Sequence, residues 1–274
     1  MATAYNLVLK PRRGWQPINW SEIWLNRQLL GFLIWRDIKI RYRQTIFGGL
    51  WAILQPLLAM LIFTFFFHKL SGVASDGPPY PLFAFAGLIF WTFFSNAVGM
   101  ASNSLVGSQV LISKVYFPRI FIPLGSIGAL LLDLIVSSLL MFAFMAYYRW
   151  PLSKNILWLP SVILGCCLAV SGLGLILSAW NVRFRDIKYA VPFFLQMGLF
   201  VTPVIYPIES VPARFRALMA LNPMTGVVIA ARYAFLGGSI HLDLILVSMV
   251  VSLGLFVAGL FIFRRTETQF ADIV

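Results

Sequence analysis

Asp133 is the single ionisable carboxylate within six long apolar stretches of the chain. Ionisable groups at membrane depth are costly, and ion-coupled carriers and proton pumps place several of them along the pathway. One carboxylate without a basic partner in a span gives thin support to such a mechanism. We therefore expect Asp133 to hydrogen-bond neighbouring helices or to border a polar cavity, and a role as proton carrier is the alternative.

The other residues that could carry chemistry do not form a set. None of the lysines follows a glycine, so the chain lacks a P-loop and cannot bind ATP by that route. The two histidines, His68 and His241, fall between the apolar stretches, and Cys166 and Cys167 are neighbours within one of them. Neither pair indicates a metal site, and adjacent cysteines in a helix do not readily form a disulfide. We expect no catalytic residue, cofactor or metal, and hence no enzyme.

The six stretches themselves indicate an all-α integral membrane protein. A helix needs about 20 apolar residues to cross the roughly 30 Å hydrocarbon layer, and each stretch is about that long. Runs of this length are helical, because the strands of a closed barrel are shorter and alternate in polarity. Hydrophobic residues make up 60% of the chain and charged residues 11%, which fits a membrane domain. The expected spans are residues 46–67, 80–106, 120–148, 156–181, 189–206 and 244–263.

The basic residues predict the orientation of these spans. The formal net charge is +12, and lysine and arginine flank the spans, which favours anionic membrane lipids over nucleic acid as partners. If six spans alternate from a cytoplasmic N-terminus, most of the 21 lysine and arginine residues fall on the cytoplasmic side. Both termini are therefore expected in the cytoplasm. The chain divides into a cytoplasmic segment (1–45), a transmembrane domain (46–264) and a cytoplasmic tail (265–274).

Two segments outside the spans are irregular. Asn19 and Glu22 have the spacing of a capping box, and the tryptophans and basic residues around and after them predict an amphipathic helix at the cytoplasmic interface. A plain anchor or an extension of span one is the alternative. Between spans five and six, prolines and glycines break residues 207–243, and the apolar run 225–236 is too short to span. We expect short re-entrant or external helices there, with an ordinary external loop as the alternative.

Three further segments carry a recognisable pattern. The first runs from Trp35 to Leu57 and contains WRDIKIRYRQT, FG, W and QPL. The second is SKVYFPR at residues 113–119, followed by Pro123. The third contains NV, RDI, TPVIYP, VP and NP between residues 181 and 223, and then Arg232. In this order, over nearly the whole chain, the segments resemble the permease subunit of ABC-type polysaccharide and polyol-phosphate exporters, which move O-antigen, capsule or teichoic-acid chains.

The resemblance implies a homodimer of six-span subunits with two copies of a separate nucleotide-binding ATPase subunit, which would bind Mg-ATP in place of this chain. It also implies a cytoplasmic interface helix before span one, and short external helices between spans five and six that cap the channel. The implied function is export of a lipid-linked polysaccharide across the bacterial cytoplasmic (inner) membrane.

The resemblance and the residue types together suggest three groups of site residues. Aromatic faces pack on sugar rings with little directional demand, although aromatic stripes also pack helices together. The expected substrate channel contains Trp51, Gln55, Phe193, Gln196 and Phe200. The expected external gate contains Pro203, Tyr206, Asn222 and Pro223. The expected ATPase interface, which could instead be a simple basic turn around residues 107–118, contains Arg36, Gln109, Val110, Leu111, Ile112, Lys114, Arg185 and Asp186.

Other functions stay open at this point. One is an ABC exporter of small hydrophobic molecules, with the same fold. Another is a channel or a proton-coupled carrier, for which Asp133 would be the essential group. A third is a membrane anchor that recruits glycan-synthesis enzymes.

Overall fold

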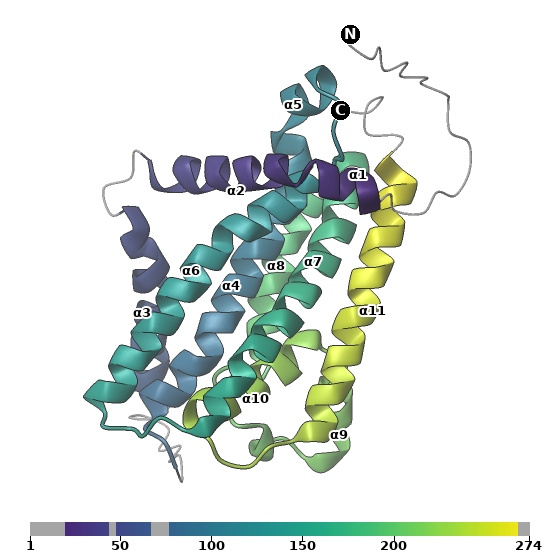
Figure 1. Cartoon of the computed structure of the whole chain (residues 1–274). Coiled ribbons are helices and arrows are strands. Elements are labelled where there is room, and N and C mark those ends of the chain that lie inside the picture. The colour runs from purple at the N-terminus through teal and green to yellow at the C-terminus, as the bar shows by residue number, and fades with distance from the viewer. Residues whose placement is uncertain (1–19, 44–47, 67–76, 268–274) are drawn as a thin grey trace.

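The protein is a bundle of helices, described here from a computed structural model that covers residues 20–43, 48–66 and 77–267 (Figure 1). Within these residues there is no β-strand. Short 3₁₀ turns η1 (Gly48–Leu50), η3 (Lys154–Trp158) and η4 (Ile208–Ser210) separate some of the helices. The α-helices are α1 (Trp20–Leu25), α2 (Arg27–Tyr42), α3 (Trp51–Phe63), α4 (Tyr80–Gly107), α5 (Gln109–Lys114), α6 (Phe121–Tyr147), α7 (Leu159–Arg183), α8 (Ile187–Val201), α9 (Ala213–Met219), α10 (Pro223–Leu236) and α11 (Leu242–Glu267).

Four of the expected spans are present as helices long and apolar enough to cross a membrane: α4, α6, α7 with its preceding η3 turn, and α11. The other two stretches form shorter apolar helices, over Trp51–Phe66 and in α8. The fifth span was predicted to extend to residue 206, which is wrong: α8 ends at Val201, and residues 202–206 form a turn. Thr202 is extended, as a residue before proline prefers to be. Helix α4 is the centre of the bundle and packs against α3, α6, α7, α8 and α10.

The N-terminal helix expected from the sequence is present but broken. Helix α1 ends at Leu25 and α2 begins at Arg27, and Figure 1 shows α2 lying across one end of the bundle. Asn19, the expected cap, lies outside the described residues. Helix α2 packs closely on α6 where α6 carries glycines: a Cβ on Gly125 would lie 3.1 Å from Leu33 Cβ, and one on Gly128 would lie 2.7 Å from Ile34. The small residues therefore allow the two backbones to approach.

The segment between α8 and α11 forms two short helices, as expected from its length and its prolines. Helices α9 and α10 are separated by a break and bent by 106°. Asn222 caps α10 by accepting a hydrogen bond from the Met224 backbone N–H at 3.0 Å. Helix α8 ends and α11 begins at the same end of the bundle, so the α9–α10 pair turns back at that end (Figure 1).

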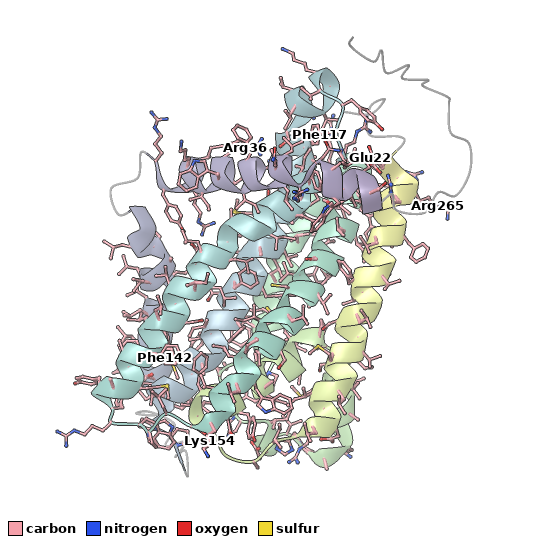
Figure 2. All side chains as sticks on the ribbon, in the orientation of Figure 1. Glu22, Arg36, Phe117, Phe142, Lys154 and Arg265 are labelled. Carbon is pink, nitrogen blue, oxygen red and sulfur yellow. The ribbon has the colours of Figure 1, made fainter. Side chains whose placement is uncertain are left out.

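The two ends of the bundle are thereby distinguished. Glu22, Arg36, Phe117 and Arg265 lie at the end crossed by α2, which we call the α2 end (Figure 2). Lys154 lies at the opposite end, where α9 and α10 are found and which we call the α10 end (Figures 1 and 2).

Candidate functional site

The gate turn, residues 202–206 between α8 and η4, is held by one buried arginine of α10. Arg232 is only 8% exposed. Its Nη1 donates to the carbonyl oxygens of Pro203 at 2.7 Å and Tyr206 at 3.3 Å, and its Nη2 donates to Val204 O at 2.6 Å. Its Nε donates to Phe83 O at 3.3 Å, and the guanidinium lies 3.5 Å from the centroid of the Phe83 ring. One side chain thus joins α10, α4 and the turn.

Local sequence explains why the turn needs such a donor. Prolines 203 and 207 have no backbone N–H, and the extended residue before Pro203 ends the helical hydrogen-bond pattern. Several carbonyl oxygens of the turn are then left without a helical partner while they are buried. The five donors of a guanidinium, fixed in one plane, suit a cluster of such acceptors. Among the described residues, Arg232 forms no ion pair with a carboxylate.

Further contacts fix both ends of the gate turn. Asn222, at the start of α10, donates through Nδ2 to the Thr202 hydroxyl at 2.7 Å. The Tyr206 hydroxyl donates back to Phe200 O at 3.0 Å. Tyr80, at the start of α4, donates to Ile205 O at 2.8 Å. The predicted gate residues are therefore brought together around one turn, with Pro203 and Pro223 buried.

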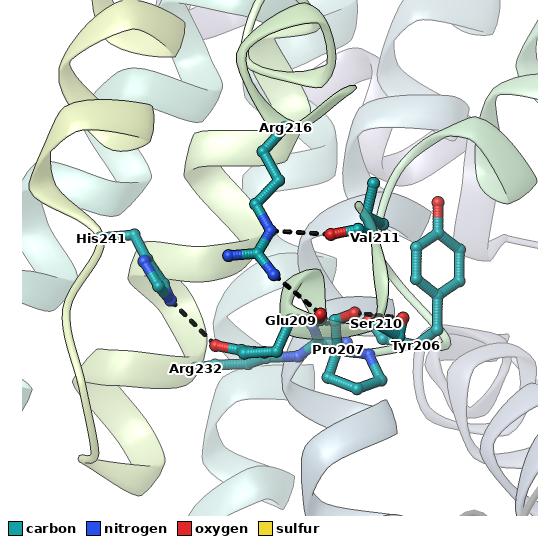
Figure 3. A network of polar contacts seen from close by, with 8 residues as sticks. All are labelled: Tyr206, Pro207, Glu209, Ser210, Val211, Arg216, Arg232 and His241. Atoms are coloured by element: carbon teal, nitrogen blue, oxygen red, sulfur yellow. Dashed lines mark hydrogen bonds and ion pairs between the residues drawn. The ribbon is translucent and has the colours of Figure 1, made fainter. Parts of the chain in front are cut away.

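A second polar network lies next to the gate turn (Figure 3). His241, before α11, contacts Glu209 of η4 with Nε2 and Oε1 2.9 Å apart. Arg216 of α9 donates through Nε to Val211 O and through Nη2 to Glu209 O, each at 2.8 Å. Partial burial raises the pKa of Glu209, but the His241 hydrogen bond, a backbone hydrogen bond and the electrostatic influence of His241 and Arg216 outweigh it, so the pKa is lowered overall. Glu209 is thus a carboxylate at neutral pH, and it links the gate turn to the start of α11.

The predicted channel residues lie on exposed faces of α3 and α8. Trp51 is 50% exposed, Phe193 57% and Phe200 54%, and Gln55 and Gln196 are exposed as well. Both helices pack against α4. Gln55 is fixed by a hydrogen bond from Asn96 Nδ2 of α4 at 3.2 Å. These side chains therefore face away from the core of this subunit, toward a substrate, another protein surface or lipid.

The predicted ATPase-facing residues of α5 are divided between surface and core. Gln109, Val110 and Lys114 are exposed, with Val110 at 66%, and Leu111 is half-buried. Ile112 is 6% exposed and belongs to a buried cluster at the α2 end, so it attaches α5 to the bundle and does not offer a surface. Helix α5 projects beyond the rest of the bundle at this end (Figure 1).

The remaining three predicted interface residues are on other segments. Arg36 forms an ion pair with Asp37 at 2.8 Å, and both residues belong to α2. Arg185 and Asp186 are exposed in the turn between α7 and α8.

Asp133 has both of the surroundings expected for it, and it has a basic partner as well. Its Oδ2 lies 2.9 Å from Nη2 of Arg41, and its Oδ1 accepts a hydrogen bond from the Tyr42 hydroxyl. It also borders a small polar cavity between α3, α4 and α6, together with Asn96 and Ser137. The basic partner was missed because it comes from α2, outside the spans.

Arg41, Tyr42 and Arg232 belong to the recognised sequence segments, but no individual role was predicted for them. Arg232 lies in the segment between spans five and six that was expected to form short re-entrant or external helices, and its side chain is buried. The available signal was a cation inside an otherwise apolar run, because a buried cation must find acceptors. Tyr80 stands between prolines 79 and 81 and carried no comparable signal.

Comparison with known proteins identifies the family of the chain. Residues 28–236 match the family described as "ABC-2 type transporter". The chain belongs to the ABC-2 type transporter family. The match runs from α2 through α10, so it includes the exposed faces of α3 and α8, the projecting α5 and the gate turn.

Individual relatives of this ABC-2 permease are named for transport as well. An "O-antigen export system permease protein RfbA" of Myxococcus xanthus is 32% identical over 92% of this chain and 98% of its own length. A protein of the same name from Klebsiella pneumoniae is 29% identical over 87% of this chain and 92% of its own length. The "Polysialic acid transport protein KpsM" of Escherichia coli is 28% identical over 86% of this chain and 92% of its own length. The family assignment makes this chain a multi-pass transport subunit.

Proposed function

We propose that this permease is the transmembrane subunit of an ABC exporter that moves a lipid-linked polysaccharide across the bacterial cytoplasmic membrane, energised by a separate ATPase. The observation that carries the proposal is the similarity, over nearly its full length, to proteins named for O-antigen export and polysialic acid transport. The alternatives are a different polymer and a small hydrophobic substrate. The experiment below therefore compares these substrates.

In this proposal two copies of the chain enclose the channel between them, and each contributes six spans. The exposed aromatic and amide side chains of α3 and α8 support this arrangement, because flat rings pack on sugar faces and amides hydrogen-bond to hydroxyl groups. Both helices are shorter than a typical span, and α8 ends in a proline turn. Short or interrupted helices suit the border of a polar path, where water or substrate satisfies the backbone.

The α2 end is assigned to the cytoplasm and the α10 end to the outside. Basic residues support the assignment: Arg36, Lys39, Lys114 and Arg265 belong to segments at the α2 end. Cytoplasmic loops of membrane proteins carry such an excess of lysine and arginine, which also contacts anionic lipid headgroups. Both termini are then cytoplasmic, and the gate turn closes the external mouth.

The projecting α5 provides the docking surface for the ATPase in this proposal. Val110→Asp adds a charge to its exposed apolar position, and burying an unpaired charge at an interface typically costs several kcal/mol. A cost of about 3 kcal/mol would weaken binding of the ATPase roughly a hundredfold. We expect the variant to fold normally but to lose ATPase in co-purification and to stop exporting glycan.

Leu152→Asp is the matched control for that experiment. Leu152 is likewise an exposed apolar side chain, at 69%, but it lies in the loop between α6 and α7 at the α10 end. This variant should bind the ATPase as the unchanged protein does. If Val110→Asp also keeps its ATPase and its export, α5 is not the docking surface.

The channel residues give a separate prediction. Phe193→Ala and Phe200→Ala each remove a ring that would contact sugars during transport and would fill the empty channel between substrates. Each loss is worth on the order of 1 kcal/mol per ring contact, so export should fall about fivefold. Small solutes should also leak from vesicles in the resting state, and Phe→Trp variants at the same positions should preserve both functions.

Phe261→Ala is the control, because Phe261 is an exposed aromatic on α11, which packs on α7 and α10 instead of lining the proposed channel. It should neither leak nor slow export at matched protein levels. If the Phe193→Ala and Phe200→Ala variants are stable, do not leak and export at the full rate, α8 does not line the channel.

The decisive test of the function is reconstitution. The permease would be co-purified with its partner ATPase, placed in vesicles, and supplied with ATP and a lipid-linked glycan. ATP-dependent appearance of glycan on the far side supports the proposal. Transport of a hydrophobic dye but no glycan would favour an exporter of small molecules, and transport driven by a proton gradient without ATP would favour a carrier.

A further inference from the structure

Three helices meet at Asp133, which is only 8% exposed although its carboxylate lies within an apolar helix. Both of its partners, Arg41 and Tyr42, belong to the last turn of α2. Arg41 also reaches α4, with its Nη1 3.2 Å from the Met100 sulfur. The carboxylate therefore fastens the end of α2 to the interior of α6.

Helix α3 is attached to the same place by polar contacts. Ser137, one turn after Asp133 on α6, donates to the Ala52 carbonyl of α3 at 3.0 Å. Gln55 of α3 accepts a hydrogen bond from Asn96 of α4. The small cavity that Asp133 borders is lined by Gln55, Asn96 and Ser137 as well. The end of α2, the beginning of α3 and the middle of α6 thus share one polar cluster.

The chemistry of this cluster differs from that of the packing around it. Closely packed apolar side chains cannot slide without opening a void, and glycine contacts such as those of α2 on Gly125 and Gly128 hold two backbones at a fixed spacing. Buried hydrogen bonds among hydroxyl, amide and carboxylate groups are directional and are strengthened by the low dielectric of the interior, so they fix the positions of the groups that they join. Helix α2 is consequently held firmly on α6, and directional hydrogen bonds attach α3 to α6 and α4.

We propose that Arg41, Tyr42 and Asp133 are positioning residues for transport, which convey a displacement of α2 to α3. The inference rests on the proposed function, because it takes the ATPase to act on the α2 end and α3 to border the channel. Arg41, Tyr42 and Asp133 do not touch the substrate in this scheme. The ion pair ensures that a movement of α2 shifts α6 and the polar surface on which α3 lies.

A second contact between α2 and α6 supplies a matched control. Asp37, on the same helix as Arg41, is 8% exposed and accepts a hydrogen bond from Ser126 of α6 at 3.1 Å. It also pairs with Arg36. This contact joins the same two helices through a buried carboxylate, but Asp37 does not border the cavity next to α3. If the Asp133 cluster only held α2 in place, loss of either carboxylate would have the same consequence.

The experiment measures ATP hydrolysis and glycan export in the same vesicles, which contain the full complex of permease and ATPase. Asp133→Asn and Arg41→Gln should assemble and hydrolyse ATP, but export about tenfold less glycan per ATP, a size typical of coupling between sites. Arg41→Lys preserves the charge and should restore most of the ratio. Asp37→Asn should export as much glycan per ATP as the unchanged permease.

An unchanged ratio in Asp133→Asn, or an equal loss in Asp37→Asn, overturns the inference. If Asp133→Asn does not assemble, Tyr42→Phe is measured instead, because it removes a single hydroxyl from the cluster. A lower ratio of exported glycan to hydrolysed ATP in this variant supports the inference, and an unchanged ratio overturns it. Complexes of the unchanged permease that hydrolyse ATP but export no glycan would refute the proposed function instead, and that result is read before any variant is compared.

Discussion

Replacement of Arg232 by methionine is expected to lower the melting temperature of the purified permease by roughly 10 °C. Methionine keeps much of the volume of the side chain but has no donor. The carbonyl oxygens of Pro203, Val204 and Tyr206 would then lose their donor, whereas that of Phe83 lies within α4 and would keep its helical hydrogen bond. Each unsatisfied group costs about 1–3 kcal/mol, and a total of about 4 kcal/mol corresponds to that shift.

The same variant tests whether the gate turn closes the external mouth. Because Arg232 joins α10 to the turn and to α4, its loss should loosen the turn before the rest of the bundle unfolds. We expect vesicles that contain the folded variant, at a temperature well below its melting point, to leak small solutes. Arg232→Lys should be intermediate in both measurements, since an ammonium group retains the charge but has fewer donors and no planar fork.

Arg214→Met is the control, because Arg214 is exposed on the neighbouring α9 and stacks only on the Phe215 ring at 4.7 Å. Exposed substitutions of this kind usually change stability by less than about 0.5 kcal/mol. A melting temperature of Arg232→Met equal to that of Arg214→Met would show that the buried hydrogen bonds do not support the turn.

Much of the architecture could be predicted from the sequence, since membrane spans are set by length and hydrophobicity alone. Helices α4, α6, α7 and α11 follow the expected stretches to within a few residues. The short helices α9 and α10 were predicted from the prolines in this segment and from an apolar run, residues 225–236, that is too short to span the membrane. These are local properties, and local properties can be read from one chain.

The polar contacts could not be predicted in the same way, because they join residues distant in sequence. Asp133 was evident as a lone carboxylate, but its partner Arg41 belongs to a helix outside the spans. Arg232 acts through backbone carbonyls of a turn that exists only because Pro203 ends α8 early. Ile112 shows the converse: its position on α5 suggested a docking surface, and tertiary packing buried it.

The close spacing between α7 and α11 could not be predicted from the sequence either, although it depends on glycine residues. Gly172 of α7 faces the backbone of α11: a Cβ there would lie 2.5 Å from Leu255 C and 2.6 Å from Phe256 N. Gly259 of α11 faces back, and its Cβ would lie 2.6 Å from Gly172 O. The two backbones therefore touch, as small residues allow in membrane bundles.

Gly172→Ala is expected to destabilise the permease by about 3 kcal/mol, near the upper end for overpacking, and to lower its yield in the membrane accordingly. The atoms that the added Cβ would meet belong to the α11 backbone, which cannot rotate away as a side chain can. Gly165→Ala, on the same helix, should cost much less, because the nearest atom is the Met249 sulfur at 2.9 Å, near the end of a flexible side chain.

Gly254→Ala completes the series, because no atom of the described residues lies within 4 Å of a Cβ built there on α11. It should be neutral or slightly stabilising, since alanine favours a helix more than glycine does. Melting temperatures of the purified variants should therefore fall in the order Gly254→Ala, Gly165→Ala, Gly172→Ala. Equal values for Gly172→Ala and Gly254→Ala would mean that α7 and α11 can separate freely, and the close approach of their backbones would then contribute nothing to the stability of the bundle.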